Sequence, residues 1–330
     1  MDAPGALHHV IARGIERREI FRDKSDYQDY LSRLEVIIDK CNLQLYAWAL
    51  IPNHFHLLIR TGLTSLSSAM KKLMTGYAVN FNKRHRRHGY LFQNRYKSIL
   101  CEEESYLLEL TRYIHLNPYR AGLVKSLEEL DRCPWSGHSA LMGKIERSWQ
   151  NSEEILVRFG KEIKKARDSY RNFIKEGIAQ GKRPELTGGG LIRSAGGWSE
   201  VLALRRHKEG MVSDSRILGN GKFVEAVLKE AEEREAETLR LKNKKIGLKD
   251  LCKEVAKVHR IEITELTSGS CRRVILKARE DMAQLAVKKL GMSGAEVARH
   301  LGVTTSCINR VINKKEISLV AETILDKWKN

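Results

Sequence analysis

The hydrophobic positions of residues 5–145 follow two periods that alternate along the chain. Short apolar runs predict buried strands, and apolar residues at helical spacing predict amphipathic helices. The pattern predicts strands over residues 8–14, 43–50, 55–60 and 90–101, and helices over residues 26–40, 66–82 and 105–116. This order of elements predicts an α+β fold, in which an antiparallel, ferredoxin-like sheet carries its helices on one face.

The middle of the chain has a different composition. It contains two charged amphipathic helices, predicted over residues 155–177 and 223–241, and glycine-rich loops at residues 188–190 and 196–197. The glycine spacing matches no phosphate-binding motif, so we interpret this segment as a helical connector. The composition therefore predicts three domains, residues 1–148, 149–245 and 246–330.

The last of these segments has the hydrophobic pattern of an all-α domain. Helices are predicted over residues 246–258, 270–290, 293–301 and 305–313. The last two are joined at Gly302 and have the proportions of a helix-turn-helix, whose second helix enters the major groove of duplex DNA. Polar or basic residues are expected to contact the duplex, namely Thr304, Thr305, Asn309 and Arg310.

The charge balance indicates nucleic acid as a partner. The net charge is +18, and a strongly basic chain binds phosphates with release of counterions. A basic membrane-surface protein is the alternative, but no long basic amphipathic helix with an aromatic face supports it.

Compartment signals predict a cytoplasmic protein. No apolar run reaches the roughly 18 residues of a membrane span, and the first residues, MDAPG, resemble no signal peptide. The six cysteines are far apart and form no Cys-x-x-Cys pair, which is typical of reduced, mostly buried thiols.

Two short segments carry groups that fit one active site. The sequence NHFHLL places His54 and His56 two positions apart in an apolar run, so on a strand both imidazoles share a face and can share a divalent metal. The sequence YIHLNP places Tyr113 and Asn117 four positions apart on a predicted helix, so they also share a face. A metal, a tyrosine nucleophile and an oxygen ligand can together cut a phosphodiester and hold the new end covalently.

Each motif alone also has a structural explanation. A His-x-His pair is more often structural than metal-binding, and Asn117 before Pro118 is a plausible helix terminator. The conjunction of both motifs on a basic chain favours the catalytic interpretation.

Basic residues cluster near these motifs, and Tyr96 stands between two of them. Cations interleaved with an aromatic suit single-stranded DNA, although a solvated face is the alternative for each run. The expected DNA contacts are Arg13, Lys83, Arg84, Arg86, Arg87, Arg95, Lys97 and Arg120.

At these residues the chain resembles the HUH single-tyrosine transposases of the insertion-sequence-200/605 type, most closely their REP-associated tyrosine transposase branch. The resemblance is carried, in order, by residues 8–14 (HHVIARG), 20–23 (IFRD), 52–58 (PNHFHLL), 89–97 (GYLFQNRYK) and 112–124 (RYIHLNPYRAGLV).

The resemblance implies a ferredoxin-like fold, with Mg²⁺ or Mn²⁺ on His54 and His56 and with Tyr113 as nucleophile. The family's third ligand is a Gln or Asn four residues after the tyrosine, which Asn117 matches. The implied substrate is single-stranded hairpin DNA of repetitive palindromic elements in the bacterial nucleoid. Its cleavage leaves a 5′-phosphotyrosine and a 3′-hydroxyl.

Residues 247–315 resemble the DNA-binding domain of the bacterial replication initiator DnaA. The resemblance is carried by Val255, Ala256, residues 261–266, Ala278, Arg279, Met282, Ala283 and the segment from Ala295. The initiator's Asp-His-Ser/Thr-Thr loop is replaced by VTTS at residues 303–306, so duplex binding is implied but recognition of an initiator box is not.

We therefore predict a metal-dependent single-stranded DNA endonuclease and strand transferase with an appended duplex-binding domain, acting as a monomer or homodimer. One alternative is a non-catalytic DNA-binding regulator on a transposase scaffold, which the presence of both histidines, Tyr113 and Asn117 disfavours. Another is a metal-dependent nuclease that uses water, in which Tyr113 only packs and forms no adduct.

Overall fold

The computed structural model describes residues 4–62, 64–181, 183, 186–187, 214–243, 247–312 and 318–329. Contacts divide the chain into two compact units, Met1–Val227 and Leu228–Asn330, and each unit is described by itself. The predicted glycine loops at residues 188–190 and 196–197, and Asn313 at the end of a predicted helix, lie outside the described residues. Within the described part of the chain, no helix is long and apolar enough to cross a membrane.

The first unit is built on a five-stranded sheet, so the predicted α+β class is confirmed. Its strands are β1 (Leu7–Arg13), β2 (Gln44–Ile51), β3 (His54–Arg60), β4 (Lys97–Cys101) and β5 (Ile217–Leu218). They lie in the order β2-β3-β1-β4-β5, and all neighbours are antiparallel except the short β4–β5 pair. Strand β1 therefore lies between β3 and β4, beside both.

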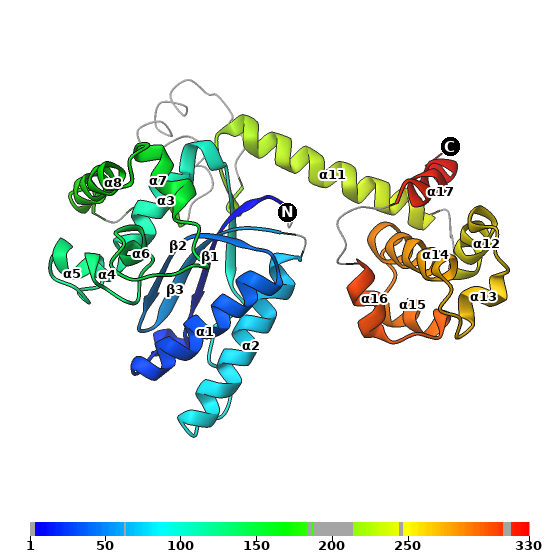
Figure 1. The fold of residues 1–330 in the computed structure, drawn as a ribbon, viewed down its shortest axis with the longest axis horizontal. Coiled ribbons are helices and arrows are strands. Elements are labelled where there is room, and N and C mark those ends of the chain that lie inside the picture. Colours follow the sequence, from blue (N-terminus) through cyan, green and yellow to red (C-terminus); the bar gives the residue numbers. More distant parts are fainter. Residues whose placement is uncertain are drawn as a thin grey trace. The chain divides into compact units, whose positions relative to one another are not determined.

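Helices cover both faces of this sheet, so the expectation of helices on one face is wrong (Figure 1). Helices α1 (Lys24–Lys40) and α2 (Leu66–Arg84) pack on the side chains of Val10, Phe55 and Leu57. Helices α3 (Glu103–His115) and α8 (Ile163–Ile178) cover the opposite face. The physical reason is visible in β2 and β3, whose continuous apolar runs bury both faces rather than alternating.

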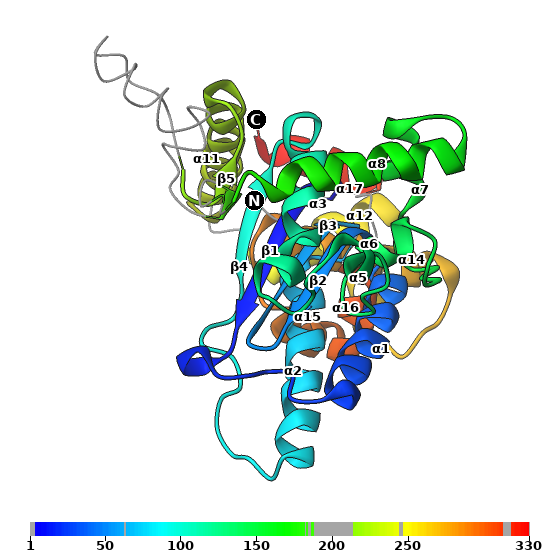
Figure 2. The ribbon, with the colours of Figure 1, turned by 90° about the vertical axis from the view of Figure 1, so that its left-hand side faces the viewer.

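The segment after α3 adds short helices to the second face. These are α4 (Asn117–Arg120), α5 (Leu127–Asp131), α6 (His138–Leu141) and α7 (Glu153–Leu156), followed by the 3-10 turn η2 (Val157–Phe159) and α8. The helix predicted over residues 155–177 is thus interrupted, at Gly160, whose φ is 152°. Ile155, Tyr170 and Ile174 are fully buried in the same core as α3, and α8 lies beside α3 (Figure 2). Residues after the predicted domain boundary at residue 148 therefore pack in the same core as residues before it.

Residues 90–101 form a shorter strand than predicted, because only Lys97–Cys101 pair along β1. The preceding loop returns to the end of β1, where Gly14 and Phe92 form an isolated bridge and Gln93 N donates to Arg13 O. The loop thereby lies against the carboxyl end of β1. The 3-10 turn η1 (Ile15–Arg17) directly follows β1 in the chain.

The second unit is helical. After α11 (Gly221–Asn243), which spans the division, come α12 (Leu248–His259), α13 (Ile263–Thr267), α14 (Arg273–Gln284) with a π-turn (Leu285–Lys289), α15 (Gly294–Leu301), α16 (Thr305–Ile312) and α17 (Leu319–Lys329). Their apolar faces meet in one core that includes Val255, Met282, Leu301 and Ile308. Gly302 adopts a left-handed φ of 65° and turns the chain from α15 into α16.

A buried polar network joins the helices of the second face. His115 Nδ1 lies 2.6 Å from the Tyr170 hydroxyl, and His138 Nε2 lies 2.8 Å from Asp131 Oδ1. The other oxygen of this carboxylate, Oδ2, pairs with Arg171. Burial lowers the pKa of both His115 and His138, so both imidazoles are neutral in the folded protein.

Acid is therefore expected to destabilise the first unit. The folded pKa of His115 lies below its unfolded value near 6.5, so as pH falls below that value the unfolded state binds more protons than the folded state. Between pH 6.5 and its folded pKa, such a histidine lowers the free energy of unfolding by at most about 1.4 kcal/mol per pH unit. Urea unfolding at pH 7, 6 and 5 measures the slope, which should be shallower for His115→Gln. Equal slopes for the two proteins would contradict this assignment.

Candidate active site

The pairing of β1 with β3 places polar side chains of both strands on the face covered by α3. Arg13 lies opposite His54 and Ile11 lies opposite His56 in the antiparallel register. Because side chains alternate along a strand, His9 and Arg13 of β1 share this face with both histidines of β3. The structure thus confirms that His54 and His56 point to one face, with their ring centroids 5.1 Å apart.

Helix α3 brings Tyr113 to these histidines. Leu110 and Ile114 are fully buried against the sheet, and Tyr113 lies on the same side of the helix. Its ring meets His56 edge-on at a centroid distance of 5.8 Å and His9 at 6.0 Å. The two segments singled out in the sequence therefore converge on one site.

His54 is held in one tautomer. Asn53 Nδ2 donates to the carbonyl oxygen of Arg17, which directs Asn53 Oδ1 toward His54 Nδ1 at 2.6 Å. Because an amide oxygen only accepts, His54 Nδ1 carries the ring proton. The lone pair of its Nε2 is then available to a metal ion.

His56 is almost completely buried, and its Nδ1 lies 2.9 Å from His9 Nε2. Burial lowers the pKa of His54 to about 4, with a contribution from the positive charge of Arg13. The pKa of His56 lies well below its ordinary value because of burial and of the neighbouring His9, His54 and Arg13. Both imidazoles are therefore neutral near pH 7, the form that binds a metal.

Asn117 begins α4, one helical turn after Tyr113. Its Nδ2 donates to the carbonyl oxygens of Tyr113 and Ile114 at 3.1 and 3.3 Å, so its Oδ1 remains the atom that can act as a ligand. Two neutral imidazoles and an amide oxygen are donor types compatible with Mg²⁺ or Mn²⁺ when phosphate and water complete the shell.

Arg120 has an internal position that the sequence did not indicate. Its guanidinium lies over the Tyr113 ring, 5.2 Å from the centroid, and donates to the carbonyl oxygens of Tyr113 and Gly177. Burial lowers its pKa. Arg120 therefore fixes the tyrosine-bearing segment against α8.

A cavity of about 310 Å³ lies at the end of β1, where Arg13 precedes the loop to η1. Arg13, Arg95 and Lys97 line it together with Tyr96, and no acidic side chain occurs among the described residues of its lining. Three of the predicted DNA contacts therefore share one basic cavity with an aromatic ring.

The other predicted contacts of the first unit lie at the end of α2 and in the loop after it. Lys83 and Arg86 are exposed, whereas the guanidinium of Arg87 lies 5.8 Å from the centroid of the Phe81 ring. Arg84 is engaged in ion pairs with Asp23, at 2.7 Å, and with Asp26.

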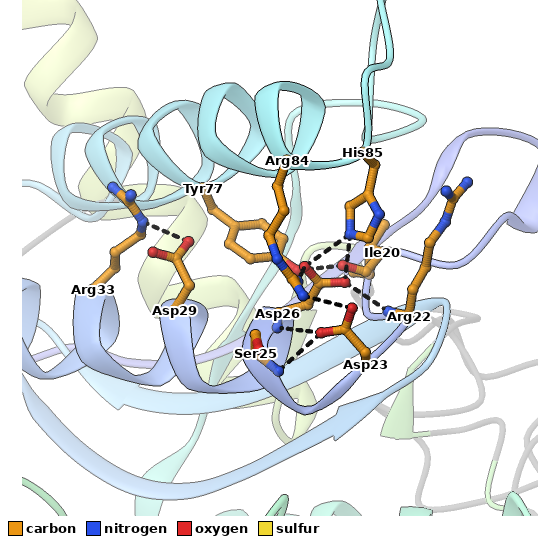
Figure 3. A network of polar contacts seen from close by, with 10 residues as sticks. All are labelled: Ile20, Arg22, Asp23, Ser25, Asp26, Asp29, Arg33, Tyr77, Arg84 and His85. Atoms are coloured by element: carbon orange, nitrogen blue, oxygen red, sulfur yellow. Dashed lines mark hydrogen bonds and ion pairs between the residues drawn. The ribbon is translucent and has the colours of Figure 1, made fainter.

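Asp23, Asp26 and His85 form the one group of at least three His, Cys, Asp or Glu side chains with metal-site spacing among the described residues. Figure 3 shows Arg84 pointing from the end of α2 toward both carboxylates, and His85 pointing toward Asp26. Backbone N–H groups at the start of α1 and of Arg22 also donate to these carboxylates. Since a guanidinium, an imidazole nitrogen and backbone N–H groups already bind the two carboxylates, this cluster fits a clamp between α1 and α2 better than a metal site.

In the second unit, the predicted duplex contacts lie on one exposed element. Thr304, Thr305, Asn309 and Arg310 are all exposed, while Ile308 of α16 is buried in the core. Thr304 Oγ1 accepts from the backbone N–H of Cys307 and so caps α16.

His9 is the residue of this site that the sequence interpretation missed. The doublet at residues 8–9 was visible, but only the β1–β3 register shows that His9, and not His8, faces His56. His8 points the other way and bonds Ser98 Oγ at 3.0 Å.

Comparison with known proteins gives a family match over part of the chain and a similarity to a solved structure. Residues 4–117 match the family model described as "Transposase IS200 like". One solved structure, titled "Structure of the REP associates tyrosine transposase bound to a REP hairpin", is similar at 16% identity and a TM-score of 0.37, over 46% of this chain and 94% of that chain. No curated protein matches the chain. The matched residues include both histidines of β3 and Tyr113, and they end at Asn117.

Substitutions in the clamp should change the stability of the protein without changing its affinity for metal. Asp26→Asn removes a buried charge that Arg84 and His85 share, and should lower the free energy of unfolding by about 1–3 kcal/mol. It should leave the Mn²⁺ affinity of the folded protein unchanged, as measured by the electron paramagnetic resonance signal of free Mn²⁺. Asp29→Asn, in the same helix with a half-exposed partner, is the control and should change stability little. A large loss of Mn²⁺ affinity in Asp26→Asn would show that the clamp holds metal.

Proposed function

We propose that the first unit is a metal-dependent single-stranded DNA endonuclease and strand transferase that acts near hairpin repeats through a covalent 5′-phosphotyrosine. The observation that carries the proposal is the contact of the Tyr113 ring with His56, beside His54. The match of residues 4–117 to IS200-like transposases supports it independently.

The chemistry assigned to Tyr113 is transesterification. Its phenolic oxygen attacks phosphorus while the bond from phosphorus to the 3′ oxygen breaks, and the phenolic proton passes to solvent as the 3′ oxygen gains one. One phosphodiester is exchanged for another and no water is consumed, so a free 3′-hydroxyl can later reverse the step. Arg120, against the ring, favours a negative charge on the phenolic oxygen.

His54, His56 and Asn117 would hold the divalent metal, which supplies positive charge to the phosphate undergoing attack. The chain's own residues add charge in the same place. Arg13 lies opposite His54, and Arg95 and Lys97 line the adjoining cavity. These cations suit the backbone of a single strand on either side of the cleaved phosphate, with Tyr96 available for stacking. Lys83 and Arg86, exposed at the end of α2, extend the basic surface.

The second unit is proposed to bind duplex DNA. Helix α16 follows α15 through the left-handed Gly302 and exposes Thr304, Thr305, Asn309 and Arg310. An exposed polar helix after a tight glycine turn is the element that a helix-turn-helix inserts into the major groove. Tethered duplex binding would raise the local concentration of the first unit near its hairpin.

A nuclease that uses water and a non-catalytic regulator are the competing functions. The strand transferase differs from both competitors in one product, because only transesterification leaves the protein covalently joined to DNA.

The nucleophile is tested by a covalent-adduct assay. Labelled single-stranded hairpin oligonucleotides from DNA flanking the gene are incubated with protein and Mn²⁺ or Mg²⁺ and separated on a denaturing gel. Wild type should give a shifted band that disappears with a chelator and in Tyr113→Phe, because phenylalanine has no attacking oxygen.

Tyr106→Phe, on the same helix, is the matched control and should retain the band. Nicking without an adduct would support the hydrolytic nuclease, and an adduct that persists in Tyr113→Phe would assign the nucleophile elsewhere. Binding of these hairpins without cleavage would favour the regulator.

The role of α16 is tested in the full chain. Asn309→Ala with Arg310→Ala should weaken duplex binding by about 1–3 kcal/mol for each lost base contact. Adduct formation on hairpin oligonucleotides should stay at the wild-type level. Lys253→Ala, an exposed cation on α12, is the control and should bind duplex normally. Loss of duplex binding and adduct together would contradict the division of labour.

A further inference from the structure

We infer that His9 is a positioning residue, which accepts a hydrogen bond from His56 Nδ1 and thereby keeps His56 Nε2 open for the metal. The inference rests on the proposed metal-dependent function and adds a residue to it. His9 itself is not placed in the ligand set.

The geometry of the pair is tightly constrained. His9 has no solvent exposure, and its Nε2 lies 2.9 Å from His56 Nδ1. The two rings are nearly parallel, with an interplanar angle of 25° and centroids 5.2 Å apart. Both rings are carried by paired strands, so the backbone ladder between β1 and β3 fixes their separation.

This hydrogen bond couples the tautomers of the two rings. A neutral imidazole carries one ring proton, and one of the two facing nitrogens must donate it. If His9 Nε2 donates, the proton of His56 sits on Nε2 and blocks that atom. If His56 Nδ1 donates, its Nε2 presents a lone pair. Metal binding at His56 Nε2 therefore requires His9 to act as the acceptor.

The other histidine of the pair has a corresponding acceptor behind it. Asn53 Oδ1 lies 2.6 Å from His54 Nδ1 and can only accept. Each histidine of the His-x-His motif thus has one nitrogen engaged by a buried or half-buried partner, an arrangement that orients metal-bound histidines in proteins. His9 differs from Asn53 because it also touches the Tyr113 ring, at 6.0 Å between centroids, so it contacts the nucleophile as well as the ligand.

His8 provides an internal control. It is the preceding residue of β1 and equally buried, at 3% exposure, but it bonds Ser98 on the neighbouring strand β4. A substitution at His8 perturbs the same strand without touching His56.

The first test measures Mn²⁺ binding to the full-length protein by the resonance signal of free Mn²⁺, with no DNA and no activity readout. Loss of such a partner weakens metal affinity by about 10- to 100-fold. His9→Phe, which keeps a ring but removes the acceptor, should therefore raise the Mn²⁺ dissociation constant by that factor. His9→Gln, whose amide oxygen can accept, should recover part of the affinity, and His8→Phe should leave it within about twofold of wild type.

The second test needs no substitution. Long-range proton–nitrogen spectra of the histidine rings in wild-type protein saturated with diamagnetic Mg²⁺ should show His56 protonated at Nδ1 and His9 unprotonated at Nε2. His56 protonated at Nε2 would overturn the inference even where a His9 variant does not fold.

The outcomes also separate this inference from the proposed function. If wild type binds Mn²⁺ and forms the Tyr113 adduct while folded His9→Phe binds Mn²⁺ equally well, only the role of His9 is refuted. If wild type binds no Mn²⁺ and forms no adduct, the proposed function fails and the inference fails with it.

Discussion

The antiparallel pairing of β1 with β3 is the constraint on which the site depends. Its register sets Arg13 beside His54 and brings His9 within hydrogen-bonding distance of His56. Because side chains alternate with a period of two, a slip of one residue would turn these polar groups into the α1–α2 core and expose Val10 to the other face. The hydrophobic residues of β1 and β3 therefore specify the chemistry as well as the fold, since they permit one register.

The position of Tyr113 depends on packing that lies beyond the segment matched to transposases. Helix α8 approaches α3 closely at Gly177, where a Cβ atom would lie 2.5 Å from the side chain of Arg112. The same glycine's carbonyl oxygen accepts from Arg120, which lies over the Tyr113 ring. The absence of a side chain at Gly177 thus allows a contact that orients the proposed nucleophile. Residues after 117 are in this sense part of the site.

The sequence was sufficient for the features that depend on local periodicity. A His-x-His pair in an apolar strand predicts two imidazoles on one face, and helical spacing predicts Tyr113 and Asn117 one turn apart. Features that depend on which elements meet were not predictable. His9 became visible only through the strand order, and the burial of Tyr170 with α3 only through long-range packing. The position of Arg120 over the Tyr113 ring was not predictable either, because sequence alone cannot show where a cation points.

The two metal-ligand candidates and the acidic cluster show how hydrogen-bond direction separates a metal site from a structural one. At His54, Asn53 occupies Nδ1 and leaves Nε2 of the neutral ring for a cation, and the role inferred for His9 does the same at His56. At Asp26, the guanidinium of Arg84, a ring nitrogen of His85 and a backbone N–H all converge on the carboxylate. A carboxylate already bound by a guanidinium, an imidazole nitrogen and a backbone N–H would have to lose an ion pair to bind a metal. Spacing alone favours the acidic cluster as a metal site, whereas the hydrogen-bond pattern favours the histidines as the candidate.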